Sequence, residues 1–274
     1  MLLCTPCLLG EKMYRFCTLF SGSSGNSTYI GNNNEGILID IGKNAKQTIL
    51  ALNKLNLTPA CVKAIFITHE HIDHVSGLRV FCSKYNIPVF ASGGTLNALD
   101  LSGHLKGKFP VFQISDYADV GDFHIEAFHT MHDSAESMGF TIFLPNGTKT
   151  SVATDLGVVT PEVEENILGS KVVLLESNHD VNMLSNGPYP YHLKRRILSE
   201  TGHLCNDDAA KAAIKLVNSG TEQMVLGHLS SENNVPELAF ETVSAELQSN
   251  GARLNDDYRL TVASRHEPIS VEVL

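Results

Sequence analysis

The chain has 274 residues, 43% of them hydrophobic, and it carries a formal net charge of −10 at pH 7. This length and apolar content suffice for one large domain or two small ones with a full core. The acidic balance argues against a surface that coats nucleic acid broadly. It does not exclude a nuclease, because metal ions and local basic clusters can still attract phosphates.

The segment 1–12 is predicted to be an N-terminal extension outside the domain, with Met13 as an alternative start. Residues 1–10 are mildly apolar but lack a basic beginning, and Glu11 and Lys12 follow at once, so a secretory signal is not expected. No apolar run of about 18 residues occurs, so we expect neither a transmembrane helix nor a membrane partner. Six cysteines without a disulfide framework favour a reduced, cytoplasmic protein.

Short apolar runs and helical patterns alternate along the rest of the chain. Runs rich in β-branched and aromatic residues predict strands, and apolar residues spaced three and four apart predict helices. The expected strands lie at 15–20, 27–30, 36–41, 63–68, 89–91, 111–114, 123–128, 139–144, 148–154, 171–176, 223–226 and 258–263. The expected helices lie at 43–55, 75–85, 190–199, 207–218 and 235–249. Strand clusters interrupted by helices indicate stacked sheets covered by helices.

The densest group of polar side chains follows the apolar run 64–67, where a buried strand is expected to end. His69, His71, Asp73 and His74 lie there within six residues. Neutral imidazole and carboxylate are ligands that suit zinc, iron and manganese. Four such groups at this spacing can be shared between two adjacent ions. The segment therefore points to a dinuclear metallohydrolase rather than to a solvated polar loop.

The pattern His-x-His-x-Asp-His in this segment resembles the signature of the metallo-β-lactamase superfamily. The resemblance implies an α/β (α+β) fold, the four-layer αββα sandwich, formed here by residues 13–274 as a single domain. It also implies that Asp40, which ends the strand 36–41, is a buried residue that orients the metal loop through hydrogen bonds. Capping of the next turn is the alternative role for Asp40.

Three later segments match further motifs of the superfamily, two of them directly after predicted strands. A His-Asp-Ser context matches His132, with His129 as the alternative in the same segment. The Thr-Asp pair at 154–155 matches Asp155, and the sequence Val-Leu-Gly-His matches His228. Taken alone, either of the last two is also typical of a turn after a strand.

The resemblance implies two divalent metal ions, and these ligand types suit zinc, manganese and iron alike. Each ion keeps an open position for water, as catalytic sites need. By resemblance, the first ion takes His69, His71 and His132, the second takes Asp73, His74 and His228, and Asp155 bridges them.

A Gly/Ser loop and a basic segment bear on the substrate. The sequence Ser-Gly-Ser-Ser-Gly-Asn-Ser at 21–27 exposes N–H and hydroxyl groups, so we expect Ser24 and Asn26 to contact a phosphate. A flexible hairpin is the alternative. The segment 189–196 ends in three consecutive cations, which suit phosphate but also suit a solvated helix face. These cations are Lys194, Arg195 and Arg196.

Two further histidines are candidate catalytic residues. His179 lies in Glu-Ser-Asn-His-Asp, after the strand 171–176, and could contact substrate or support a ligand. His203 lies in Gly-His-Leu and is the preferred general acid, although a structural turn histidine is the alternative.

These segments together closely resemble the YycJ/WalJ-type exonuclease family, over about residues 13–265. The family is associated with 5′-to-3′ degradation of double-stranded DNA, so the resemblance implies a metal-dependent phosphodiesterase or nuclease with a nucleic-acid partner. The short distance from Asp155 to His228 leaves no room for the β-CASP domain that other nucleases of the superfamily contain. We expect only a small insertion near 178–206, which contains the basic segment.

The mechanism implied is attack on the phosphate by a hydroxide that two metal ions activate. Asp73 is expected to accept the proton of the water, and His203 or His179 to protonate the leaving oxygen. The rival readings are a small-molecule thioester or lactone-type hydrolase, an RNA-directed nuclease, and a metal-dependent binding protein without catalysis. The sequence predicts no particular oligomeric state.

Overall fold

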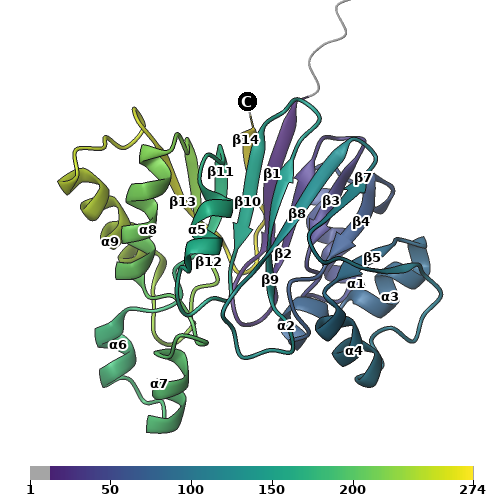
Figure 1. Ribbon diagram of the computed structural model, residues 1–274, viewed down its shortest axis with the longest axis horizontal. Coiled ribbons are helices and arrows are strands. Elements are labelled where there is room, and N and C mark those ends of the chain that lie inside the picture. Colours follow the sequence, from purple (N-terminus) through teal and green to yellow (C-terminus); the bar gives the residue numbers. More distant parts are fainter. Residues whose placement is uncertain (1–12, 274) are drawn as a thin grey trace, which may run out of the picture.

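The computed structural model describes residues 13–273, so the predicted extension at 1–12 and residue 274 lie outside the described residues. Within the described part, two seven-stranded sheets pack face to face and helices cover both outer faces (Figure 1). The layers run helix, sheet, sheet, helix, which confirms the predicted αββα sandwich.

The first sheet is built mainly from the N-terminal half of the chain. In spatial order its strands are β14 (Ile269–Val273), β1 (Tyr14–Phe20), β2 (Ser27–Gly31), β3 (Gly36–Ile39), β4 (Val62–Phe66), β5 (Val89–Ala91) and β6 (Val111–Gln113). From β14 to β3 neighbouring strands are antiparallel, and from β3 to β6 they are parallel. The C-terminal strand β14 thus closes the edge beside β1.

The second sheet follows in the chain and has the same mixed character. In spatial order its strands are β13 (Arg259–Val262), β12 (Gln223–Gly227), β11 (Val172–Glu176), β10 (Lys149–Ala153), β9 (Met138–Phe143), β8 (Phe123–His129) and β7 (Tyr117–Val120). The four strands from β13 to β10 are parallel, so the carboxyl ends of β10, β11 and β12 meet at one edge.

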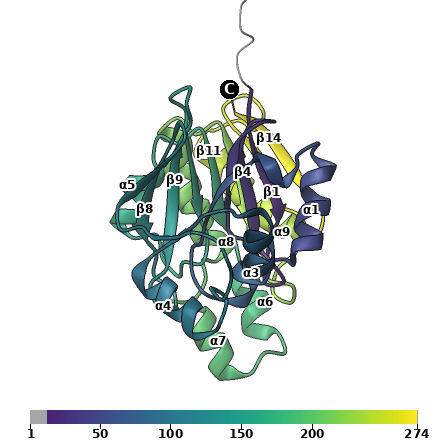
Figure 2. The same cartoon turned by 90° about the vertical axis from the view of Figure 1, so that its right-hand side faces the viewer.

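Helices cover each sheet on its outer face, and a few lie at one end of the sandwich (Figures 1 and 2). The first sheet carries α1 (Ala45–Lys54), α3 (Leu78–Tyr85) and α4 (Gly93–Leu101). The second carries α5 (Pro161–Ile167), α8 (Asn206–Asn218) and α9 (Pro236–Ser249). The remaining helices are α2 (Ile72–Val75), α6 (Val181–Asn186), α7 (Tyr191–Ile197) and the 3₁₀ turn at Pro59–Cys61. Among the helices of residues 13–273, none combines the length and the hydropathy needed to span a bilayer.

Both faces of the central strands are buried, which is why those strands read as continuous apolar runs. In β11, Val172 and Leu174 pack between the two sheets, whereas Val173 and Leu175 pack under the helices. Alternate residues therefore contribute to different apolar layers, as the two-residue period of a strand requires. Three apolar layers hold the four layers of secondary structure together.

Each predicted strand and helix has a counterpart in the structure, but six elements were not predicted: β7, β14, α4, α5, α6 and the 3₁₀ turn at Pro59–Cys61. Helix α4 begins with two glycines, which disfavour a helix, and it is started instead by Ser92, whose side chain accepts the Thr95 N–H at 3.2 Å. The predicted helix 75–85 is interrupted, since α2 ends at Val75 and α3 begins at Leu78. Helices α6 and α7 lie in the segment 178–206 that was predicted as an insertion.

Candidate metal centre

Asp40 fixes the loop between β4 and α2 that carries the histidine-rich motif. The Asp40 carboxylate is buried and accepts the backbone N–H and the hydroxyl of Thr68, both at 2.9 Å. Its Oδ2 also lies 2.8 Å from Nδ1 of His74. Holding one ring nitrogen of a histidine orients the other, so Asp40 turns Nε2 of His74 toward the centre. This geometry agrees with the supporting role that the resemblance implies.

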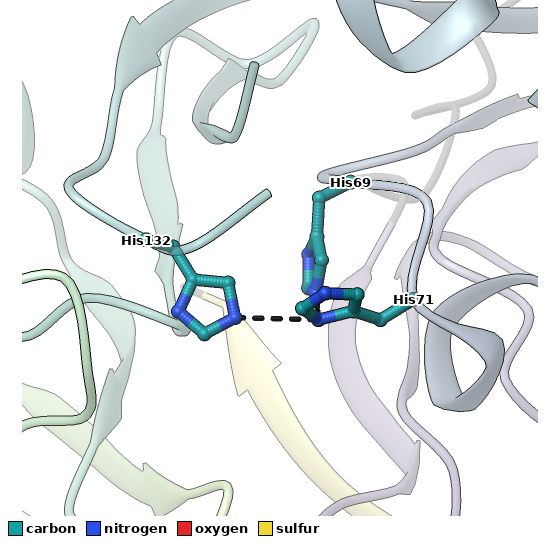
Figure 3. Close-up of side chains that lie close together, drawn as sticks. All are labelled: His69, His71 and His132. Atoms are coloured by element: carbon teal, nitrogen blue, oxygen red, sulfur yellow. Dashed lines mark hydrogen bonds between the residues drawn. The ribbon is translucent and has the colours of Figure 1, made fainter. Parts of the chain in front are cut away.

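His69, His71 and His132 converge from two separate loops (Figure 3). Nδ1 of His71 lies 2.9 Å from Nε2 of His69 and 3.4 Å from Nε2 of His132. The far nitrogen of His132, Nδ1, lies 3.1 Å from the Gly202 carbonyl. Burial lowers the pKa of His69 well below its usual value, and that of His132 in the same direction, so both imidazoles are neutral and can offer lone pairs. The alternative residue, His129, is exposed and lies outside this cluster.

A second cluster lies beside the first and contains Asp73, His74 and His228. Oδ2 of Asp73 lies 3.6 Å from Nε2 of His74 and 3.7 Å from Nε2 of His228. Asp155 lies between the two clusters, with its oxygens 3.4 Å from Nε2 of His74, 3.5 Å from Nε2 of His228 and 3.8 Å from Nε2 of His132. The structure thus brings together all seven side chains predicted as ligands.

The donor atoms of this site fit divalent metal ions. Oδ2 of Asp155 and Nε2 of His228 are buried, and neither finds a hydrogen-bond partner among residues 13–273. A buried polar atom without a partner is costly, and carboxylate oxygen and imidazole nitrogen are atoms that a divalent cation satisfies. Burial alone would lower the pKa of His74, but Asp155 and Asp40 raise it to about 9. The surplus of negative charge that produces this shift also favours a bound cation.

Glu176 is a site residue that the sequence analysis missed. Its buried Oε1 lies 2.8 Å from Nδ1 of His203 and 2.7 Å from Nδ1 of His228. Its Oε2 accepts the backbone N–H groups of Leu156 and Leu204, at 3.0 and 3.2 Å. Burial would raise the pKa of this carboxyl, but His203 and His228 hold it well below its usual range. The available signal was an acidic residue at the end of an apolar strand, the same signal that marks Asp40.

His203 and His179 lie in very different surroundings. The side chain of His203 is 15% exposed, and its ring centre is 5.0 Å from that of His132 and 5.2 Å from that of His228. His179 is buried, and neither of its ring nitrogens has a partner among the described residues. Burial lowers the pKa of His179 to about 4, so this imidazole holds no proton at neutral pH. The geometry therefore favours His203 over His179 as a group that exchanges protons with a substrate.

Comparison with known proteins agrees with this geometry. The sequence profile of the family described as Beta-lactamase superfamily domain matches residues 36–229. The chain belongs to the beta-lactamase superfamily. Exodeoxyribonuclease YycJ of Bacillus anthracis is 38% identical over 262 residues, which cover 94% of this chain and 98% of YycJ. Exodeoxyribonuclease WalJ of Streptococcus pneumoniae is 35% identical over 257 residues, which cover 92% and 95% of the two chains. The chain is thus a member of the YycJ/WalJ family, as its motifs predicted.

The fold of this YycJ/WalJ family member is shared by distant solved structures. The metallo-beta-lactamase fold protein YhfI from Bacillus subtilis superposes with a TM-score of 0.70 at 13% identity, covering 94% of this chain and all of YhfI. At this identity the likeness shows the architecture and not the activity.

The Gly/Ser loop of this YycJ/WalJ family member reaches the second cluster through Asn26. The Asn26 amide nitrogen lies 3.0 Å from Nε2 of His74 and 3.4 Å from Oδ2 of Asp73, while its oxygen accepts the Gly22 N–H at 2.8 Å. Asn26 is buried, whereas Ser24 is exposed on the same loop. Of the two predicted phosphate contacts, Asn26 therefore borders the metal cluster directly, and Ser24 faces solvent beside it.

The three cations of α7 are in part engaged within the protein. Arg196 forms a two-pronged ion pair with Asp133, next to His132. The ammonium of Lys194 donates to a backbone carbonyl of α6 at 2.8 Å. Arg195 is exposed, and its guanidinium lies 6.0 Å from the ring centre of Tyr191. Arg196 thus connects the predicted insertion to the loop that carries His132. Of the three cations, only Arg195 forms neither an ion pair nor a hydrogen bond to a carbonyl among the described residues.

Proposed function

We propose that this YycJ/WalJ family member is a metal-dependent exonuclease that degrades double-stranded DNA from 5′ to 3′. The observation that carries the proposal is the pair of adjacent donor clusters joined by Asp155. The relatives that are 35–38% identical over nearly their whole length are named exodeoxyribonucleases, which supports DNA as the substrate.

Residues 13–274 would act as a single domain with a small insertion near 178–206. A reduced, cytoplasmic setting suits the buried free thiols of Cys17, Cys61, Cys82 and Cys205.

Two divalent ions, of zinc, manganese or iron, would be held by the seven side chains of the joined clusters. Bound there, such ions act as Lewis acids and lower the pKa of water enough to supply hydroxide at neutral pH. One ion would take His69, His71 and His132, the other Asp73, His74 and His228, with Asp155 shared.

The surrounding residues orient these side chains and the reacting groups. Asp40, Glu176 and the Gly202 carbonyl each hold the far nitrogen of a ligand histidine, which fixes the direction of its lone pair. Asp73, which is 21% exposed beside the histidines of the second cluster, would accept the proton of an attacking water molecule. The amide of Asn26 can donate to a phosphate oxygen beside the second cluster.

His203 would protonate the leaving oxygen. Its Nδ1 lies 2.8 Å from Oε1 of Glu176, which orients the ring, and the ring remains partly open to solvent. This arrangement of a carboxylate behind an imidazole is typical of histidines that transfer protons. His179, without a proton at neutral pH, is the weaker candidate.

Replacing His203 by asparagine will lower kcat on DNA by about 10²–10⁴-fold while metal content stays at the wild-type level, because only the proton donor is lost. On an aryl phosphodiester, whose p-nitrophenolate leaving group departs without a proton, kcat will fall far less. Steady-state rates on both substrates and elemental analysis of the protein check this. Equal losses on the two substrates, or loss of metal, would show that His203 is a structural residue or a ligand.

Replacing His179 by leucine will make the protein less sensitive to acid. The pKa of His179 falls from its ordinary 6.5 to about 4 on folding, so between these values the unfolded chain binds the extra proton and stability is lost as pH falls. Above pH 6.5 this imidazole adds no pH dependence. Relative to wild type, the free energy of unfolding of the variant should rise by up to about 3 kcal/mol between pH 6.5 and 4. Denaturant titrations across this pH range measure the free energy of unfolding, with the exposed His192→Leu variant as control. A difference in unfolding free energy between wild type and His179→Leu that stays constant across the range would contradict the prediction.

A thioester or lactone-type hydrolase is the rival that shares this site. Turnover of an aryl phosphodiester and of an aryl thioester by the same metal-loaded protein separates the two classes. The proposal expects turnover of the diester, and turnover of the thioester alone would reject it.

A further inference from the structure

A groove lies between α1 and residues 266–268 of the connection from β13 to β14, and Figure 2 shows α1 beside β14. It holds about 490 Å³. Its lining combines an apolar floor with basic side chains, including Phe20, Lys43, Leu50, Lys54, His266 and Pro268. Leu50 is 53% exposed, so the floor is open to a ligand from solvent.

The Gly/Ser loop contacts both the groove and the metal centre. Phe20 lines the groove, and the next residue, Ser21, accepts the backbone N–H of His228 at 2.8 Å. At the other end of the loop the stem of Lys43 lies against Gly25, where an added Cβ would be 2.7 Å from the Lys43 side chain. Gly25 directly precedes Asn26, which borders the second cluster. Lys43 therefore lies both in the groove and against the loop that carries Asn26.

Two cations flank the Gly/Ser loop, Lys43 beside Gly25 and Arg265 beside Gly22, and Lys43 also lines the groove. The half-buried Lys43 makes no hydrogen bond or ion pair through its ammonium among residues 13–273. Arg265 lies beside Gly22 and donates to the Leu229 carbonyl at 2.6 Å, with no carboxylate partner in the described part of the chain. The nearby acid Glu267 is neutralised by Lys54 at 2.6 Å. In a chain of net charge −10, this is a local site for anions.

We propose that this groove binds the DNA strand next to the scissile bond, with its phosphates against Lys43 and Arg265 and its bases over the apolar floor. A polynucleotide strand presents an anionic backbone and apolar base faces together, which matches the two kinds of lining. Exposed Ser23 and Ser24, between the two cations, supply further donors to a phosphate. The inference rests on the proposed nuclease activity. It places the strand on the α1 side rather than on α7, where Lys194 and Arg196 are already engaged.

Lys43 is the residue to test, because Arg265 also holds the carbonyl next to His228 and its loss would disturb the metal centre. With the metal-loaded full chain, Lys43→Ala should lower kcat/KM on a linear duplex about tenfold more than on a p-nitrophenyl ester of a mononucleotide. The slope of log(kcat/KM) for DNA against log salt should become shallower by about one. Lys43→Arg should retain most of the wild-type rate. Lys63→Ala, the same change at the exposed start of β4, should match wild type.

The outcomes separate this inference from the proposed function. If wild type degrades DNA and Lys43→Ala does so with unchanged kcat/KM and salt slope, the groove is not the strand-binding site. A larger defect in the Lys194→Ala/Arg195→Ala double variant would then place the strand on α7. If wild type hydrolyses the small diester but leaves DNA intact, the proposed function fails, and the groove inference fails with it.

Discussion

Replacing Asp155 by asparagine will lower hydrolytic activity by at least about 10³-fold and reduce the metal content of the purified protein. Asp155 is buried, and its two oxygens face histidines of both clusters within 3.8 Å. Asparagine has the same shape and tolerates the left-handed backbone at this position, where φ is 58°, so the fold should persist. The substitution removes one negative charge and one oxygen from the site that the two ions would share.

Elemental analysis and steady-state kinetics on an aryl phosphodiester measure both effects. Asp122→Asn is a matched control, because Asp122 is exposed in the turn between β7 and β8. That control should keep wild-type metal content and rate. An Asp155→Asn variant that binds metal and turns over like wild type would show that Asp155 is not shared between ions.

Replacing Glu176 by glutamine will weaken metal binding about 10–100-fold and destabilise the protein by about 3 kcal/mol. One oxygen of Glu176 faces two imidazole nitrogens and the other accepts two backbone N–H groups. A glutamine amide must place its NH₂ against one of these pairs. If the NH₂ group faces the backbone N–H groups of Leu156 and Leu204, buried donors lie against another donor. If it faces Nδ1 of His203 and of His228, both histidines lose their hydrogen-bond acceptor.

Metal competition titrations and denaturant unfolding of the metal-free protein separate the two effects. The exposed Glu241→Gln on α9 is the matched control and should change neither quantity. Unfolding free energy and metal affinity that both remain at wild-type values would contradict the role assigned to Glu176.

Much of the metal centre could be predicted because its side chains follow buried strands. His69, Asp155 and His228 each come one to three residues after an apolar strand ends. The parallel strands β10, β11 and β12 bring the ends before Asp155 and His228 together, and β4, which precedes His69, lies in the facing sheet. Glu176 carries the same signal at the end of β11. His179 and Asp180 follow within four residues, and the pattern alone does not distinguish Glu176 from them as the side chain that contacts His203 and His228.

Other features depend on distant pairing or on backbone conformation, and neither is visible in a local pattern. Lys43 and Arg265 both lie against the Gly/Ser loop, where the pairing of β14 with β1 returns the C-terminal segment to the N-terminal sheet. Asp40, Asp155 and His228 have positive φ values of 61°, 58° and 55°. Non-glycine residues rarely adopt this conformation, and the surrounding hydrogen bonds must stabilise it at these strand ends.

End-labelled substrate tests metal-dependent degradation of duplex DNA from its 5′ end directly. Wild type and Asp73→Ala, each loaded separately with manganese, zinc or iron, are incubated with linear duplex labelled at the 5′ or the 3′ end. Wild type with at least one of these metals should release the 5′ label first as short products, and Asp73→Ala should release none. Intact DNA with every metal, at full metal occupancy and with the small diester hydrolysed, would contradict this expectation.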